Sequence, residues 1–173
     1  MHTKAVFRSA QALNEAGFHA LRFNFRGVGT STGSWGEGID EMEDVVAALD
    51  WLEEECPELP LLVGGFSVGS RVGLRVGVGE ERVKAMLGIG LAVSLFDYEF
   101  LDGITKPVLI VQGEEDEFGP GPEVARALEA LSGPITLERV PGAGHFFDGH
   151  FEELQQVVRE YFTTGPGAVP FTS

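Results

Sequence analysis

Three residues of this chain carry the side chains of a nucleophile, a base and an orienting acid. Ser67 lies within Gly65-Phe66-Ser67-Val68-Gly69, Asp116 follows three positions after Gly113, and His145 follows a Gly-Ala-Gly turn. A serine hydroxyl is a poor nucleophile until a base removes its proton during attack. Histidine has a suitable basicity, and a buried carboxylate can fix its tautomer and support the imidazolium. The three residues therefore predict nucleophilic acyl chemistry, provided that the fold brings them together.

The pentapeptide around Ser67 lies where a strand should pass into a helix. A serine on such a turn takes a strained backbone geometry that lifts its hydroxyl clear of the sheet. We expect glycine at positions 65 and 69 because side chains there would clash with the neighbouring strand and helix. The pattern alone is weak evidence in a chain with 24 glycines. The order and placement of Asp116 and His145 strengthen it.

Apolar periodicity predicts strands that alternate with helices. We expect helices over 4–16, 38–55, the stretch after Ser67, the stretch around 124–131, and 151–162. We expect strands over 19–25, 60–65, 83–89, 107–112 and 135–140. This alternation predicts an α/β fold, with a mostly parallel sheet and helices on both faces. The loops after residues 25, 65, 90, 112 and 140 should then share one edge, where ligands bind in such sheets.

The chain is expected to form one domain over residues 1–162, followed by a flexible tail over 163–173 that is rich in Gly, Pro and Thr. Within the domain, each chemical residue has competitors. Ser67 could be a small residue at a tight turn. Asp116 has three acidic neighbours, and His145 competes with three other histidines; these are Glu114, Glu115, Glu117, His150, His19 and His2.

The ordered set of motifs resembles the α/β-hydrolase family, and in particular small bacterial hydrolases of the dienelactone-hydrolase and serine-aminopeptidase-like type. The matching segments are 21–29, 65–69, 113–116 and 144–147, and the resemblance runs from Met1 to about Phe162. It implies a triad of Ser67, Asp116 and His145, in the chain order that is typical of this fold. It also implies that the backbone N–H of Val68 helps to hold the oxyanion, that acyl compounds such as carboxylic esters are substrates, and that no cofactor is required.

The chain departs from that family at its beginning. In the family, the strand before the first helix lies between the strands expected here at 19–25 and 60–65, but this sequence starts at the helix. We therefore expect a gap in the sheet with unpaired backbone groups. Our hypothesis is that Met1 is an internal methionine of a longer protein. The loop after that strand normally supplies the second oxyanion donor, so its source in this chain stays open.

Aromatic residues near the expected edge are candidates for lining an acyl pocket. Those that we select are Trp35, Phe66, Phe118 and Phe146. The segment over 90–106 is too short for a lid domain, so the site should be shallow and open. Small acyl groups, or extended ones with polar ends, suit such a site better than long lipids.

Composition excludes several other classes of function. A formal net charge of −15 argues against nucleic acid and anionic membrane surfaces as partners. Cys56 is the only cysteine, which rules out an intramolecular disulfide and favours the cytoplasm.

No Cys/His group has metal-ligand spacing. The turn over 27–32 resembles a dinucleotide fingerprint, but Thr32 occupies its last glycine position. A small-molecule acyl substrate is the expected partner, and a homodimer is left open.

Two further functions use the same residues. The chain could be a catalytically weak or inactive binding module, because the expected central strand and its loop are missing. It could also be an acyltransferase or a peptidase with the same triad, since fold and triad do not determine the substrate.

Overall fold

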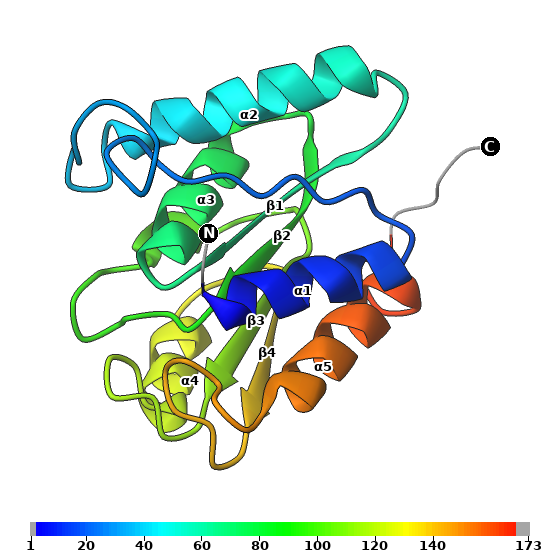
Figure 1. Cartoon of the computed structure of the whole chain (residues 1–173). Helices are drawn as coiled ribbons and strands as arrows, with labels where there is room; N and C mark the ends of the chain where they lie inside the picture. Colours follow the sequence, from blue (N-terminus) through cyan, green and yellow to red (C-terminus); the bar gives the residue numbers. More distant parts are fainter. Residues whose placement is uncertain (1–2, 169–173) are drawn as a thin grey trace.

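In the computed structural model, which describes residues 3–168, four parallel strands form one sheet with helices on both faces (Figure 1). The strands lie in the order β1 (Leu61–Phe66), β2 (Val83–Ile89), β3 (Val108–Gly113) and β4 (Ile135–Val140). The helices are α1 (Lys4–Glu15), α2 (Glu41–Glu55), α3 (Val68–Gly79), α4 (Gly121–Glu129) and α5 (Phe151–Thr163), with a short 3₁₀ turn, η1 (Glu99–Leu101). The expected α/β fold is confirmed.

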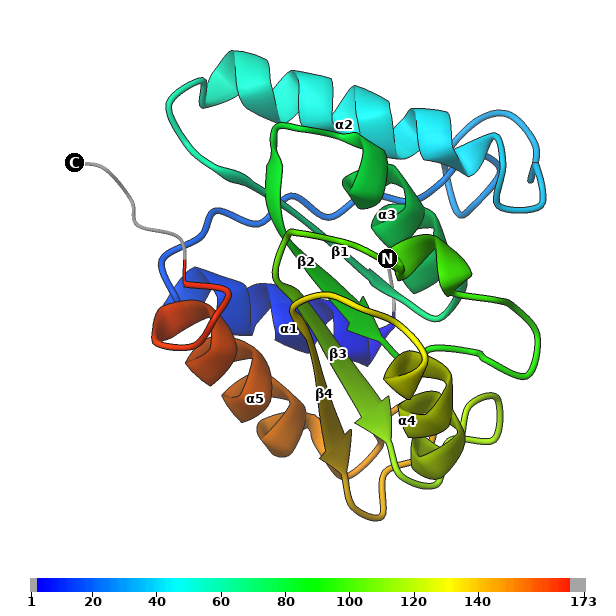
Figure 2. The same cartoon turned by 180° about the vertical axis from the view of Figure 1, so that it is seen from behind.

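The helices divide between the two faces of the sheet, as the front and back views show (Figures 1 and 2). Helices α1 and α5 cover one face, while α2, α3 and α4 cover the other. Successive residues of each strand pack on opposite faces of the sheet. Met86 of β2 packs toward α3, whereas its neighbour Leu87 packs in the cluster with α1 and α5. All six residues of β3 are buried, which explains why this strand begins with four consecutive apolar residues.

The strand predicted over 19–25 does not form, and this prediction was wrong. The segment is extended, but among residues 3–168 β1 pairs only with β2, so the sheet of the described chain ends at β1. Within the part of the chain that the structure describes, the backbone of residues 19–23 makes no hydrogen bond. Figures 1 and 2 show the segment running in the same general direction as β1, between α1 and α2. A strand requires a partner, and β-propensity alone cannot supply one.

The polar loop that precedes α2 is held by two carboxylates of that helix. Glu41 is fully buried, and its two carboxylate oxygens accept 2.7 Å hydrogen bonds from the N–H groups of Gly36 and Gly38. Gly38 has a φ of 82°, in the left-handed region, so α2 begins at Glu41 and not at residue 38 as expected. Figure 1 shows this loop at the N-terminal end of α2.

Asp44 of α2 holds the start of the same loop. Its carboxylate accepts hydrogen bonds from the backbone N–H of Arg26 at 2.8 Å and from the Arg26 guanidinium at 2.9 and 3.0 Å. Burial acts to raise the pKa of Asp44, but the hydrogen bonds from Arg26 outweigh it and the pKa lies below its ordinary value. The segment over 19–25 is therefore tied to α2 at its end, although it is not paired to the sheet.

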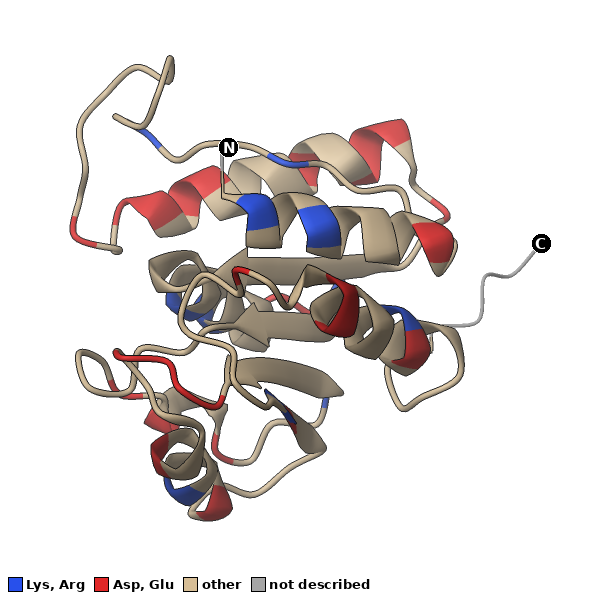
Figure 3. Ribbon diagram, turned by 60° about the horizontal axis from the view of Figure 1, so that its bottom comes forward, with Lys and Arg blue, Asp and Glu red and all other residues tan. Residues whose placement is uncertain are grey.

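The end of the chain extends the packed structure slightly beyond the expected boundary. Helix α5 continues to Thr163, and Gly167 is buried beside Tyr161. The remainder of the predicted flexible tail, residues 169–173, lies outside the described residues. Acidic positions are distributed over several helices and loops (Figure 3). Among residues 3–168, no helix combines the length and apolar character needed to cross a bilayer.

Candidate active site

Ser67 lies at the strained turn between β1 and α3. Its φ and ψ are 55° and −122°, a conformation that L-residues rarely adopt. A Cβ atom at Gly65 would lie 2.1 Å from the backbone oxygen of Gly69, so position 65 requires glycine. The expectation for Gly69 was wrong, because a Cβ there would meet only the ring of Phe25, at an ordinary 3.9 Å. Of the two flanking positions, only position 65 therefore requires glycine on steric grounds.

A buried hydroxyl holds the turn against the sheet. The Ser70 side chain donates to the carbonyl of Gly65 or of Ile89, at 2.7 and 2.8 Å, and accepts a 2.9 Å hydrogen bond from the Ile89 N–H. The N–H of Ser67 also donates to the Ile89 carbonyl, at 2.8 Å. These bonds connect the first turn of α3 to both β1 and β2, so the nucleophile candidate sits on a rigid support.

The three predicted residues come together at the carboxyl ends of three strands. The Oγ atom of Ser67 lies 3.0 Å from Nε2 of His145, and Nδ1 of the same ring lies 2.8 Å from Oδ2 of Asp116. Asp116 is fully buried and His145 is 4% exposed. Both distances lie within the range expected of a nucleophile, a base and an orienting acid. The geometry permits a proton to pass from the serine hydroxyl to the imidazole.

Burial distinguishes Asp116 from its acidic neighbours. Asp116 is the one buried acid of the 114–117 loop: Glu115 and Glu117 are exposed, and Glu114 is half-buried and pairs with Arg139 at 3.4 Å. Its second oxygen, Oδ1, accepts a 2.8 Å hydrogen bond from the N–H of Phe118. Burial and this hydrogen bond fix the carboxylate in the direction of the imidazole.

The other histidines lie away from this chain of hydrogen bonds. His150 precedes α5, is partly buried, and its Nδ1 lies 3.5 Å from Glu153. His19 is exposed and lines a cavity beside β1. His2 lies outside the described residues. His145 is thus the histidine that the structure places beside Ser67.

Gln112 is a residue of this site that the sequence analysis missed. Its fully buried side chain donates from Nε2 to Oδ2 of Asp116 at 2.9 Å and to the carbonyl of Gly119 at 2.7 Å. Its Oε1 accepts a 2.7 Å hydrogen bond from the N–H of Leu91. The available signal was a polar residue at the end of an otherwise apolar buried strand, since such a residue needs a specific partner.

Three of the four predicted aromatic lining residues surround the imidazole. The ring centroids of Phe66, Phe118 and Phe146 lie 4.9, 4.8 and 5.1 Å from that of His145. Phe146 is 53% exposed, so this cluster opens to solvent. Trp35 is also exposed, and it lines a cavity of about 310 Å³ that reaches Phe66 and Val68.

The backbone N–H of Val68 directly follows the Ser67 hydroxyl in the chain and begins α3. Within residues 3–168 it takes part in no backbone hydrogen bond outside the helix. The first N–H groups of a helix lack partners within it and favour negative charge. Val68 can therefore donate to an oxyanion that forms beside Ser67. No group of three or more potential metal ligands occurs in the same residues.

A family model described as an alpha/beta hydrolase domain matches residues 1–157. An uncharacterised protein of Rickettsia prowazekii is 31% identical, over 95% of this chain and 73% of that protein. Among solved structures, an alpha-beta serine hydrolase homologue from Coxiella burnetii is 34% identical with a TM-score of 0.85, covering 92% of this chain and 76% of the other. A serine hydrolase without a lid from Xanthomonas campestris is 33% identical with a TM-score of 0.88, covering 98% and 77%.

A parallel sheet, a serine at its strand-to-helix turn and a short connection between β2 and β3 define an α/β hydrolase architecture without a lid. The chain belongs to the α/β-hydrolase family. More distant structures, such as the esterase Est1E from Butyrivibrio proteoclasticus with bound ferulic acid, share the fold at 20% identity and a TM-score of 0.82. The finer resemblance to dienelactone hydrolases and serine aminopeptidases stays a prediction.

Proposed function

We propose that this protein is a serine hydrolase that cleaves carboxylic esters or related acyl compounds. Ser67 attacks the acyl carbonyl while Nε2 of His145 takes its proton, and Asp116 holds the imidazole and supports its positive charge. The N–H of Val68 donates to the oxyanion. His145 then gives the proton to the leaving alcohol, and the acyl group remains on Ser67.

Hydrolysis of the acyl-enzyme completes the cycle. A water molecule gives a proton to His145 as its oxygen attacks the acyl carbon, and the proton returns to Ser67 when the acid leaves. The proposed cycle uses no cofactor, and its partner is a small acyl substrate in the cytoplasm. Phe66, Phe118, Phe146 and Trp35 are the residues that we propose to contact the substrate.

The observation that carries the proposal is the continuous hydrogen-bonded series from Ser67 through His145 to a fully buried Asp116. A fully buried carboxylate is costly unless it is paired and hydrogen-bonded, and here the imidazole, the Gln112 side chain and the N–H of Phe118 are its partners. The open aromatic cluster suits small acyl groups or extended ones that leave the site toward solvent.

Labelling with a fluorophosphonate probe tests the proposal. We expect the probe to react with Ser67, as located by peptide mass spectrometry, and Ser67→Ala to lose labelling. Hydrolysis of p-nitrophenyl acetate should fall by at least about a thousandfold in this variant. His145→Gln should show a comparable loss, whereas its matched control His150→Gln should retain activity.

Equal hydrolysis rates for the unaltered chain and Ser67→Ala, both shown to be folded, would instead favour an inactive binding module. If labelling succeeds, a panel of ester, thioester and aminoacyl substrates with competing alcohol and amine acceptors separates an esterase from an acyltransferase or a peptidase.

A further inference from the structure

Ser94, in the connection between β2 and β3, directs both of its hydrogen-bond donors at one atom. Its backbone N–H and its Oγ hydroxyl donate to the carbonyl oxygen of Phe118, at 3.0 and 2.7 Å. Ser94 is exposed, so its hydroxyl could equally well hydrogen-bond to water. The convergence of both donors on a single carbonyl therefore indicates that Ser94 fixes the backbone of Phe118.

Phe118 in turn contacts both the acid and the base of the triad. Its backbone N–H donates to Oδ1 of Asp116 at 2.8 Å. Its ring packs edge-on against the imidazole of His145, with 4.8 Å between the ring centroids and 70° between the ring planes. A shift of Phe118 would therefore move the donor that holds the acid and also the surface against which the base packs.

The loop that carries Asp116 is held against the β2–β3 connection from two sides. On the buried side, Gln112 accepts a hydrogen bond from the N–H of Leu91 and donates one to the carbonyl of Gly119. A Cβ atom at Gly119 would overlap the carbonyl oxygen of Leu91, so the two backbones lie in close contact. On the solvent side, Ser94 supplies the hydrogen bonds. Gln112 therefore fixes the inner end of this junction and Ser94 fixes the outer end.

The far end of the same connection carries an equivalent pair of hydrogen bonds that is remote from the triad. The backbone N–H and the hydroxyl of Ser132 both donate to Oδ1 of Asp102, at 2.9 and 2.7 Å. Ser132 is exposed, as Ser94 is, and it precedes the first residue of β4. It therefore lies at the edge of the sheet opposite to Ser67. The two serines make the same bonds, but only the bonds of Ser94 lead to the triad.

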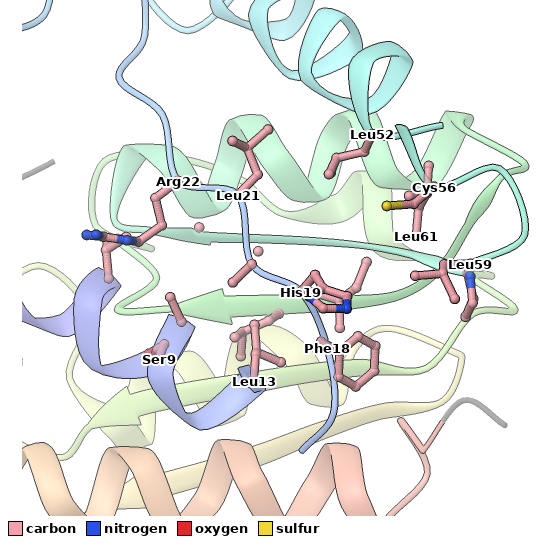
Figure 4. Close-up of a pocket in the computed structure, with 18 of the residues that line it drawn as sticks. Ser9, Leu13, Phe18, His19, Leu21, Arg22, Leu52, Cys56, Leu59 and Leu61 are labelled. Atoms are coloured by element: carbon pink, nitrogen blue, oxygen red, sulfur yellow. The ribbon is translucent and has the colours of Figure 1, made fainter. Parts of the chain in front are cut away.

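We propose that Ser94 is a positioning residue, which fixes Phe118 and thereby keeps Asp116 and His145 aligned for proton transfer. This inference rests on the proposed function of the triad. The hydrogen bonds of Ser94 end at a backbone carbonyl and reach no reacting atom. Neither Ser94 nor Ser132 lines either of the two cavities beside β1, the smaller of which Figure 4 shows. Loss of the Ser94 hydroxyl should therefore lower kcat and leave KM unchanged.

Steady-state kinetics with p-nitrophenyl acetate test the proposal. Ser94→Ala should lower kcat by about threefold to tenfold at constant KM, because a small misplacement of the catalytic groups is costly. Ser94→Thr keeps a hydroxyl on the same carbon and should restore most of the rate. Ser132→Ala, which removes the equivalent bond at the far end, should keep the full rate. An unaltered kcat in Ser94→Ala, or an equal loss in Ser94→Thr or Ser132→Ala, would overturn the proposal.

Exchange of the His145 Nδ1 proton with water gives a second readout, which needs no turnover. The signal is followed by NMR and assigned by its loss in His145→Gln. This proton should exchange about three to ten times faster in Ser94→Ala and at an unaltered rate in Ser132→Ala. Faster exchange in a protein that hydrolyses no ester would refute the proposed function but support the alignment by Ser94. Ester hydrolysis with neither kcat nor exchange altered in Ser94→Ala would refute the role of Ser94 alone.

Discussion

The Nε2 atom of Gln112 and Nδ1 of His145 both lie within hydrogen-bond distance of Oδ2 of Asp116, at 2.9 and 2.8 Å. The same glutamine reaches the backbone of Gly119 and Leu91, in the loops after β3 and β2. Gln112 therefore positions the acid and fixes the two loops that flank it. It touches none of the atoms that the proposed reaction would change, so it acts through Asp116.

We expect Gln112→Met to lower kcat for ester hydrolysis by about tenfold to a hundredfold, because a small displacement of Asp116 misaligns the imidazole. KM should change little. The measurement is steady-state hydrolysis of p-nitrophenyl acetate, together with the pH profile of kcat. Gln156→Met, at an exposed position of α5, is the matched control. A folded Gln112→Met variant with unaltered kcat and pH profile would show that Asp116 is positioned without it.

The backbone strain at Ser67 predicts a gain in stability when glycine replaces this residue. Glycine adopts a φ of 55° without steric cost, so Ser67→Gly should raise the free energy of unfolding by about 1 kcal/mol. Ser67→Ala retains the strain and serves as the control. Urea denaturation of the three proteins measures the difference. A Ser67→Gly variant no more stable than Ser67→Ala would mean that the turn stores no strain.

Glu41 should contribute more to stability than an exposed glutamate of the same helix. Glu41→Ala leaves the N–H groups of Gly36 and Gly38 without their acceptor, at a cost of about 1–3 kcal/mol in the free energy of unfolding. Glu54→Ala, near the other end of α2 and exposed, should change stability by less than about 0.5 kcal/mol. Thermal denaturation compares them, and equal losses would contradict the assigned role of Glu41.

Both tyrosines should ionise at a higher pH in the folded protein than in the unfolded chain. Burial raises the pKa of Tyr98 to about 12 and outweighs the opposing effect of the nearby Arg71 charge. Burial also raises the pKa of Tyr161. Since the chain contains only two tyrosines, the ultraviolet absorbance of tyrosinate at pH 10 should be lower in the folded protein than after unfolding in urea, where it should be about half-developed.

The raised pKa of Tyr98 also predicts that the folded protein loses stability as the pH rises. The pKa of Tyr98 is higher in the folded protein than its unfolded value near 10, so its contribution to stability is complete below pH 10. This contribution is lost as pH rises from 10 toward 12. Tyr98 alone should cost about 1.4 kcal/mol for each pH unit in that window. Tyr98→Phe removes the titrating group and should show a shallower decline. An identical slope for this variant would refute the prediction.

The chemistry and its approximate location could be read from residue types and local patterns. The apolar run of β3 and the turn around Ser67 are local features, because a buried strand and a strained strand-to-helix turn each require particular residues in consecutive positions. Parallel order then places Asp116 and His145 at the same edge of the sheet. For this reason the three distant side chains could be proposed as one site before their distances were known.

Other features depend on contacts between distant parts of the chain. His19–Phe25 has the composition of a strand, yet its state is decided by whether a partner strand lies beside it. The role of Gln112 depends on the loops at Leu91 and Gly119, which approach only when the sheet has formed. The burial that distinguishes Asp116 from Glu115 and Glu117 likewise arises from packing. Sequence determined which side chains could react and at which edge of the sheet they lie. Tertiary structure decided which acid is buried and what positions it, because hydrogen-bond partners and burial are supplied by residues remote in the chain.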